Sequence, residues 1–225
     1  MFDLGVLYRD GLGVAQDYDK ARELFQKAAD AGDTDAMTTL GWLYENGHSV
    51  AQDYDKAREL FQKAADAGNA LAMTNLGFLY EKGHGVAQDY GKAREWYQKG
   101  ADAGNAVAMY DLGVLYRDGH GVAQDYDKAR ELFQKAADAG DADAMNNLGA
   151  LYGKGLGVAQ DYGKAREWYQ KGADAGNTDS MFNWVGRTST ARALPKGCVL
   201  DVSRVRRKFQ VPRHWAACRY SAEHR

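Results

Sequence analysis

Residues 36–69 read AMTTLGWLYENGHSVAQDYDKARELFQKAADAGN, and close variants of this segment begin again at residues 72, 108 and 144. All six methionines keep the same step of 36 residues. A fixed period between about 20 and 50 residues is typical of solenoids and other repeat arrays. The chain is therefore predicted to be a stack of copies of one structural unit rather than a globular domain with a single core.

One copy, residues 105–140, shows what this unit must be. Its first half, NAVAMYDLGVLYRDG, places apolar or small residues on one helical stripe, and Gly119 is suited to end that helix. Its second half, YDKARELFQKAADAG, forms a second stripe that ends at Gly140. The side chains of Asn105 and Asp125 stand where they can cap the two helices. Each repeat is predicted to be two antiparallel helices, so the fold class is all-α.

A glycine lies in the middle of the first helix of every copy. Glycine in a helix interior costs about 0.8–1 kcal/mol relative to alanine. Because the chain accepts this cost five times, we predict that two helices cross there too closely for a side chain to fit. The five positions are Gly5, Gly41, Gly77, Gly113 and Gly149.

The consensus A-M-x-x-L-G-x-L-Y-x-x-G, followed after a short loop by V-A-Q-D-Y-x-K-A-R-E, resembles the Sel1-like repeat, a relative of the tetratricopeptide repeat with a longer loop between its helices. The resemblance covers residues 1–182 in five copies, the first truncated, with a sixth begun at about residue 177. It implies a right-handed α/α superhelix that serves as an interaction scaffold, often in bacteria. Some cysteine-rich relatives have been called β-lactamases, but these repeats contain no cysteine, so that activity is not carried over.

The charge of the chain is divided between two regions. Residues 1–182 hold 19 Lys and Arg against 29 Asp and Glu, whereas residues 183–225 hold 10 against 2. The second region has no clear helical or strand period, and we interpret it as a basic tail that is disordered, loosely packed or read out of frame. The alternative is an arm for nucleic acid or another anionic surface. That arm would consist of Arg204, Arg206, Arg207, Lys208, Arg213, Phe209 and Trp215.

The start of the chain bears on its location. It opens with MFDLGVLYRDG, already inside a repeat, without the basic segment and apolar core of a signal peptide. No run of 18 apolar residues is present, so no membrane span is expected. The sequence as given predicts a cytoplasmic monomer. A periplasmic or secreted location follows if the N-terminus is truncated.

Comparison of the copies shows which positions vary on the first helix. In tetratricopeptide-type solenoids this face lines the concave groove, so the resemblance implies that the variable residues form the binding surface. Three of them, Trp42, Phe78 and Tyr110, are expected to form an exposed aromatic track, and aromatic residues are enriched in binding hot spots. The alternative is that these positions are merely exposed or pack against the next repeat. The candidate residues are Thr38, Trp42, Glu45, Asn46, Thr74, Phe78, Glu81, Tyr110, Val114, Arg117, Asn146 and Ala150.

The remaining polar residues do not indicate chemistry. His48, His84 and His120 would stand about 10 Å apart in stacked loops, too far for one zinc ion, and are interpreted as loop filling. Cys198 and Cys218 lack the spacing of zinc ligands. No catalytic triad, phosphate-binding loop or metal cluster is visible, so no enzyme activity, metal or cofactor is expected. The sequence predicts a scaffold for a protein or peptide partner, basic or polar because the repeats are acidic.

Two alternatives to the scaffold remain open. The chain could be a degenerate fragment of a longer repeat protein without a separate function. It could also be a cell-envelope repeat protein related to hydrolases, which would need a convergent polar site.

Overall fold

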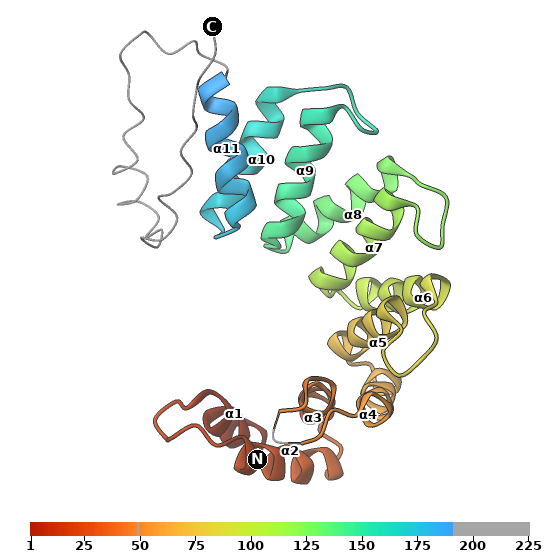
Figure 1. The fold of residues 1–225 in the computed structure, drawn as a ribbon, viewed down its shortest axis with the longest axis vertical. Helices are drawn as coiled ribbons and strands as arrows, with labels where there is room; N and C mark the ends of the chain where they lie inside the picture. The colour runs from red at the N-terminus through yellow and green to blue at the C-terminus, as the bar shows by residue number, and fades with distance from the viewer. Residues whose placement is uncertain (49, 191–225) are drawn as a thin grey trace, which may run out of the picture. The chain divides into compact units, whose positions relative to one another are not determined.

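The computed structural model describes residues 1–48 and 50–190, and every regular element in this part of the chain is an α-helix (Figure 1). Residues 1–186 form one compact unit. The helices are α1 (Phe2–Asp10), α2 (Tyr18–Asp30), α3 (Thr34–Asn46), α4 (Tyr54–Asp66), α5 (Ala70–Lys82), α6 (Tyr90–Asp102), α7 (Ala106–Asp118), α8 (Tyr126–Asp138), α9 (Ala142–Lys154), α10 (Tyr162–Asp174) and α11 (Thr178–Thr190).

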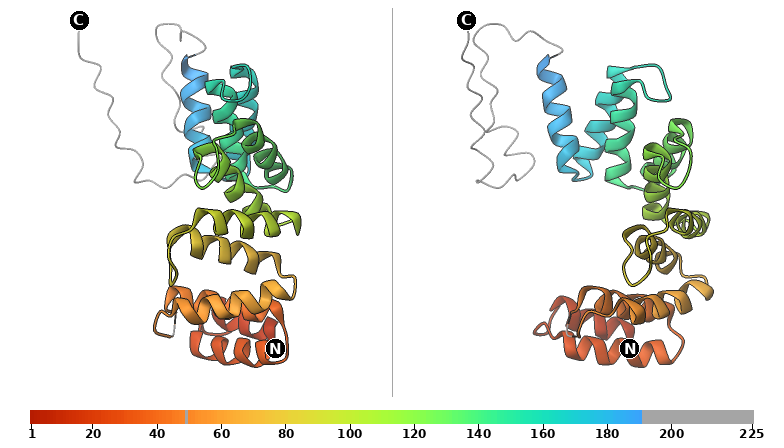
Figure 2. Two further views of the ribbon diagram at one scale, coloured as in Figure 1. Left: turned by 90° about the vertical axis from the view of Figure 1, so that its right-hand side faces the viewer. Right: turned by 45° about the vertical axis from the view of Figure 1, so that its right-hand side comes forward.

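The helices pack in the order in which they follow along the chain. Each odd-numbered helix from α1 to α9 packs against the even-numbered helix that follows it, and each pair packs against the next pair (Figures 1 and 2). This arrangement is the all-α solenoid of helix pairs that the repeat period predicted. We call the odd-numbered helices the first helices and the even-numbered ones the second helices of their repeats.

Capping residues set the helix ends. Each second helix follows an aspartate whose Oδ1 accepts a hydrogen bond from the backbone N–H three residues later, at 2.9–3.0 Å. These aspartates were interpreted as caps, and the structure confirms it for Asp17, Asp53, Asp89, Asp125 and Asp161. Each first helix from α1 to α9 ends at a glycine with φ between 68° and 73°, a left-handed conformation that side chains with a Cβ rarely adopt.

The glycine in the middle of each first helix packs directly against an aromatic ring of the second helix. A Cβ added to Gly113 would lie 2.7 Å from Cε1 of Phe133, and the other four copies would give clashes of 2.5–2.7 Å. The five rings are at most 2% exposed. The predicted close crossing of the two helices is therefore confirmed.

The hydrophobic core lies at the junctions between repeats. In the first junction, Phe25 of α2 packs with Leu40 and Leu43 of α3, and the same arrangement recurs between α4 and α5, α6 and α7, and α8 and α9. Leu4 and Leu7 stand at the equivalent positions of α1 and are 45% and 39% exposed. The preceding repeat therefore completes the burial of these two leucine positions.

The sixth copy begins as expected, and its helix extends past the predicted boundary of the repeats. Asn177 accepts a hydrogen bond from the backbone N–H of Ser180 at 2.6 Å, and Ser180 is fully buried. Helix α11 continues to Thr190, whereas the sequence placed the end of the repeats at residue 182. Residues 191–225 lie outside the described part of the chain. The interpretations of the basic tail, of its aromatic residues and of both cysteines therefore stay predictions.

Replacing Gly113 by Ala tests the close crossing. The added methyl group would meet the Phe133 ring at 2.7 Å, and overpacking of this kind costs about 1–3 kcal/mol, more than the gain in helix propensity. We expect a lower midpoint of thermal unfolding, measured by far-UV circular dichroism. Gly91→Ala is the matched control, because α2, α4 and α8 carry an aspartate at the equivalent position, and it should not lower the midpoint. Equal midpoints for Gly113→Ala and wild type would contradict the packing argument.

Candidate protein-binding surface

The candidate residues lie on four first helices, α3, α5, α7 and α9, but they are not equally accessible. Trp42 and Phe78 occupy the same register position in α3 and α5, and they are 39% and 37% exposed. Tyr110, expected as the third exposed ring, is half-buried, with its ring centroid 5.7 Å from that of Phe133. Trp42 and Phe78 therefore form the exposed aromatic pair of this surface.

Two other candidates are buried, and their hydroxyl groups are bonded within their own helices. Thr38 and Thr74 are 3% and 4% exposed. Their hydroxyl groups donate hydrogen bonds to the backbone oxygens of Thr34 and Ala70 at 2.8 and 2.9 Å. A partner cannot reach these threonines without displacing the packing between repeats.

The candidates on α7 and α9 lie in more enclosed positions. Val114 and Ala150 are half-buried. Asn146 accepts hydrogen bonds from Ser180 Oγ at 3.2 Å and from Asn183 Nδ2 at 3.1 Å. At this position the side chain joins α9 to α11, which is the packing role that the sequence left open as an alternative.

The three histidines fill the space between consecutive repeats. The ring centroid of His48 lies 5.5 Å from that of Tyr18 and 4.9 Å from that of Trp42. His84 lies 4.6 Å from Tyr54 and 5.7 Å from Phe78 in the same way, and His120 stacks on Tyr90. Across the described residues, no group of three or more potential ligand side chains could hold a metal ion. The histidines therefore pack the loops, and two of them also support the exposed aromatic pair.

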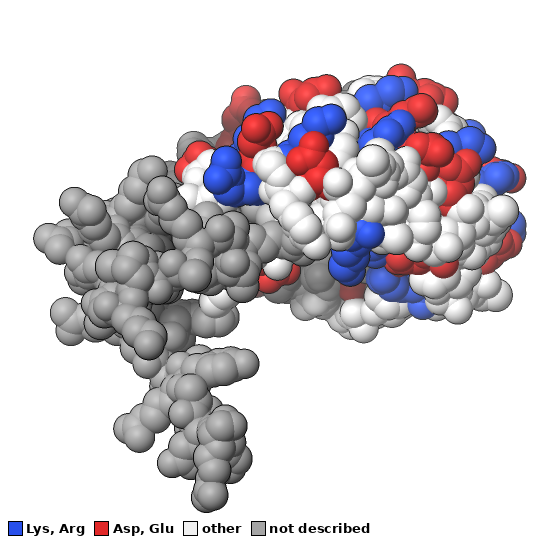
Figure 3. Space-filling view, turned by 90° about the horizontal axis from the view of Figure 1, so that it is seen from above, with Lys and Arg blue, Asp and Glu red and all other residues white. Residues whose placement is uncertain are grey.

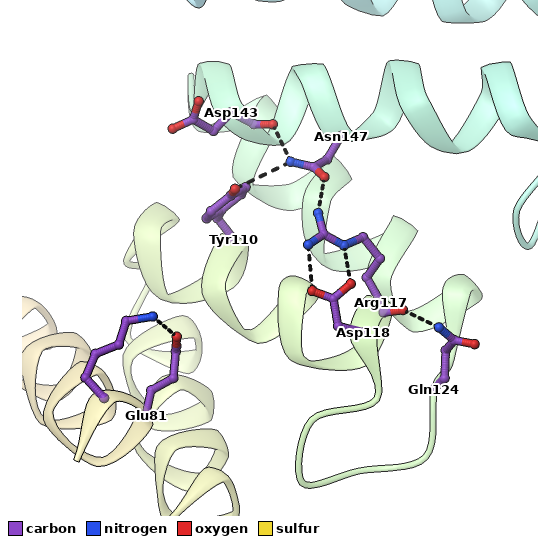
Figure 4. Close-up of polar contacts among 8 residues, drawn as sticks. Glu81, Tyr110, Arg117, Asp118, Gln124, Asp143 and Asn147 are labelled. Carbon is purple, nitrogen blue, oxygen red and sulfur yellow. Dashed lines mark hydrogen bonds and ion pairs between the residues drawn. The ribbon is translucent and has the colours of Figure 1, made fainter. Parts of the chain in front are cut away.

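Glu81 is held by two donors at the end of α5. The hydroxyl of Tyr97 donates a hydrogen bond to Glu81 Oε2 at 2.8 Å. The ammonium of Lys82 pairs with the other carboxylate oxygen of Glu81, the residue labelled in Figure 4. The same ammonium lies 5.5 Å from the ring centroid of Phe78. The hydrogen bond to Glu81 raises the pKa of Lys82.

Arg117 takes the equivalent position in α7 and is engaged by other side chains. Its guanidinium donates to both carboxylate oxygens of Asp118 at 2.7 Å and to Asn147 of α9 (Figure 4). Asn147 in turn donates to the backbone oxygen of Asp143 at 3.0 Å. The hydrogen bonds to Asp118 raise the pKa of Arg117 and lower that of Asp118. Arg117 thus links two repeats.

Asp111, in the middle of α7, is a half-buried carboxyl group that the sequence analysis did not identify. Burial, followed by the nearby carboxylates of Glu81 and Asp141, raises its pKa to about 7. A separation of 30 residues indicates such neighbours in the sequence, because Arg117 and Asn147, which are in contact, are 30 residues apart. Glu81 and Asp111 have the same separation, which joins the end of one first helix to the middle of the next.

Charges of both signs are mixed over the face seen in Figure 3, where Lys and Arg alternate with Asp and Glu among uncharged residues. The acidic residues of the repeats therefore do not form one continuous negative patch on this face. The helices among the described residues are too short or too polar to cross a membrane.

Stacked helix pairs whose cores lie at the junctions define the protein as an α/α solenoid. The chain belongs to the Sel1-like repeat family, because the Sel1 repeat profile matches five consecutive stretches, residues 1–33, 34–69, 70–105, 106–141 and 142–177. Solenoids of this family generally mediate protein–protein interactions and are typically non-enzymatic scaffolds.

Solved structures agree with this assignment. A Sel1 repeat protein from Oxalobacter formigenes has 32% sequence identity and a TM-score of 0.82, over 92% of this chain and 85% of that one. A protective antigen of uropathogenic Escherichia coli has 32% identity and a TM-score of 0.51, over 82% of this chain and 47% of that one. An immunity protein of Pseudomonas aeruginosa has 26% identity and a TM-score of 0.58, over 80% and 69%. Comparison with curated protein sequences gave no match.

Asp111 gives the stability of the protein a specific pH dependence. Its pKa is about 7 in the folded state against 3.8 ordinarily, so the unfolded chain ionises first and stability falls as the pH rises from about 4 to 7. Asp111→Asn does not lose stability as the pH rises, because the amide does not ionise. Asparagine also occupies the same position in neighbouring repeats. We expect the variant to be more stable than wild type by about 2 kcal/mol at pH 8, allowing for partial exposure, and equally stable near pH 4.

Urea unfolding of both proteins at several pH values measures this difference. Asn75→Asp provides the reciprocal variant, because it places a carboxyl group at the equivalent half-buried position of α5 and should lose stability over the same pH range. A stability difference between Asp111→Asn and wild type that stays constant from pH 4 to 8 would contradict the raised pKa.

Proposed function

We propose that this protein is an interaction scaffold that binds a peptide or protein segment along the concave groove formed by its first helices, with Trp42 and Phe78 as anchors. The observation that carries the proposal is the exposure of these two large rings at one register position in consecutive repeats. The aromatic residues that face the mid-helix glycines are buried instead. Aromatic side chains that can be enclosed by a partner dominate the energy of many interfaces.

The surroundings of the two rings favour binding. His48 stacks against Trp42, and His84 contacts the edge of Phe78, so both rings are held in place before a partner arrives. Ordering a flexible side chain on binding costs about 0.5–1.5 kcal/mol, and a pre-ordered anchor avoids much of that cost. Glu45 follows Trp42 three residues later and favours a partner with a basic group, whereas Glu81, at the same position after Phe78, is already paired with Lys82.

The double variant Trp42→Ala, Phe78→Ala tests this surface. We expect random peptides displayed on phage to be enriched on immobilised wild-type protein, and the selected peptides to bind the variant at least about 30-fold more weakly, since hot-spot truncations cost 2 kcal/mol or more. Affinities would be measured by fluorescence polarisation with synthetic copies of the peptides.

Tyr162→Ala is the matched control, because Tyr162 is an exposed aromatic residue on a second helix, 61% exposed. It should leave peptide binding unchanged. Circular dichroism should show the same helicity for all three proteins, since none of the changes touches the core. Selected peptides that bind the double variant as well as wild type would exclude this surface as the binding site.

A further inference from the structure

An aromatic ring and a carboxylate stand three residues apart twice on the first helices, as Trp42 and Glu45 in α3 and as Phe78 and Glu81 in α5. In α5 the chain itself supplies a cation to this pair. The ammonium of Lys82 pairs with Glu81 and lies 5.5 Å from the centre of the Phe78 ring. The arrangement combines an ion pair with a cation–π contact.

The copy in α3 has the same ring and carboxylate but a different residue beside them. Asn46 stands at the position of Lys82, and its Nδ2 donates a hydrogen bond to the backbone oxygen of Trp42 at 2.9 Å. Phe61 stands at the position of Tyr97, so the hydroxyl donor is missing too. Glu45 therefore lacks both groups that stabilise its counterpart Glu81.

Glu45 is half-buried, and within the described part of the chain its carboxylate has no hydrogen-bond or ion-pair partner. Burial raises its pKa, which is the response of a carboxylate that has lost solvent without gaining donors. The Trp42 ring beside it remains 39% exposed although His48 stacks on it at 4.9 Å. A cation that approached from solvent would gain both an ion pair and a contact with the indole ring.

We propose that Trp42 and Glu45 receive the side-chain ammonium of a lysine from the bound partner, in the arrangement that Lys82 takes within α5. The proposal rests on the proposed function, because it concerns the same surface, and it names the group that the surface recognises. In α7 the position of Glu45 is taken by Arg117, which is basic and engaged by Asp118 and Asn147. The receptor for an incoming lysine is therefore specific to α3.

The test uses the peptide acetyl-Gly-Gly-Lys-Gly-Gly-amide and the indole N–H signals of the ¹⁵N-labelled protein, with the Trp42 signal assigned by Trp42→Phe. We expect the peptide to shift the Trp42 signal saturably. The same peptide with an acetylated lysine should not, because acetylation removes the charge. Glu45→Gln should weaken the association at least tenfold. Asn46→Lys should abolish it, since an ammonium tethered as in α5 would then occupy the site.

The second copy provides a reciprocal test. Phe78→Trp introduces an indole reporter into α5, where Lys82 already occupies the position of the cation, and its signal should not respond to the peptide. Adding Lys82→Asn to that variant should make the reporter respond. Circular dichroism of each variant checks that helicity is retained, so that a lost response is not a loss of folding.

The outcomes separate this proposal from the proposed function. Three results would overturn the lysine site. They are an unmoved Trp42 signal, an unchanged association with Glu45→Gln or Asn46→Lys, and tighter binding of the same peptide with arginine in place of lysine. If phage-selected peptides still depended on Trp42 and Phe78, the binding surface would stand without it. If those peptides ignored both rings while the lysine peptide still shifted the Trp42 signal, the groove assignment would fail and the lysine site would remain.

Discussion

The contact between a mid-helix glycine and the aromatic ring of the following helix is the constraint on which the rest of the structure depends. Five rings lie where a Cβ on the facing glycine would be 2.5–2.7 Å away, so each helix pair closes to the same short distance. Because this contact is the same in every repeat, equivalent residues reach equivalent places. Glu45 in α3 and Glu81 in α5 therefore occupy equivalent positions.

Stacking is the second constraint. The core clusters lie between one repeat and the next, so the burial of a first helix is completed by its predecessor. Leu40 and Leu43 are almost completely buried, whereas Leu4 and Leu7 at the equivalent positions of α1 are not. Stability in such an array is a sum of repeat and nearest-neighbour contributions. Surface positions can then vary between copies without disturbing the core, which allows one repeat to carry Lys82 where another carries Asn46.

The candidate surface was only partly predictable. Variation between copies identified Trp42 and Phe78, which are exposed, but it also selected Thr38, which is buried. It did not identify Tyr97 or Asp111, because variation at one register position says nothing about which side chain of another helix approaches it. These contacts join residues that are adjacent only after the helices cross and the repeats stack.

The period, the helix pairs, the caps and the close crossing at the glycines could all be predicted from the amino-acid sequence. These features follow from chemistry within a few residues, repeated every 36 positions, and the family resemblance rests on the same residues. Three features depend on the packing of the helices: which faces of the first helices are open, the contact of Arg117 with Asn147, and the loss of solvent around the carboxyl group of Asp111. The physical reason is that burial and pairing across repeats depend on how neighbouring helices are oriented, and a period states the spacing of repeats without stating their orientation.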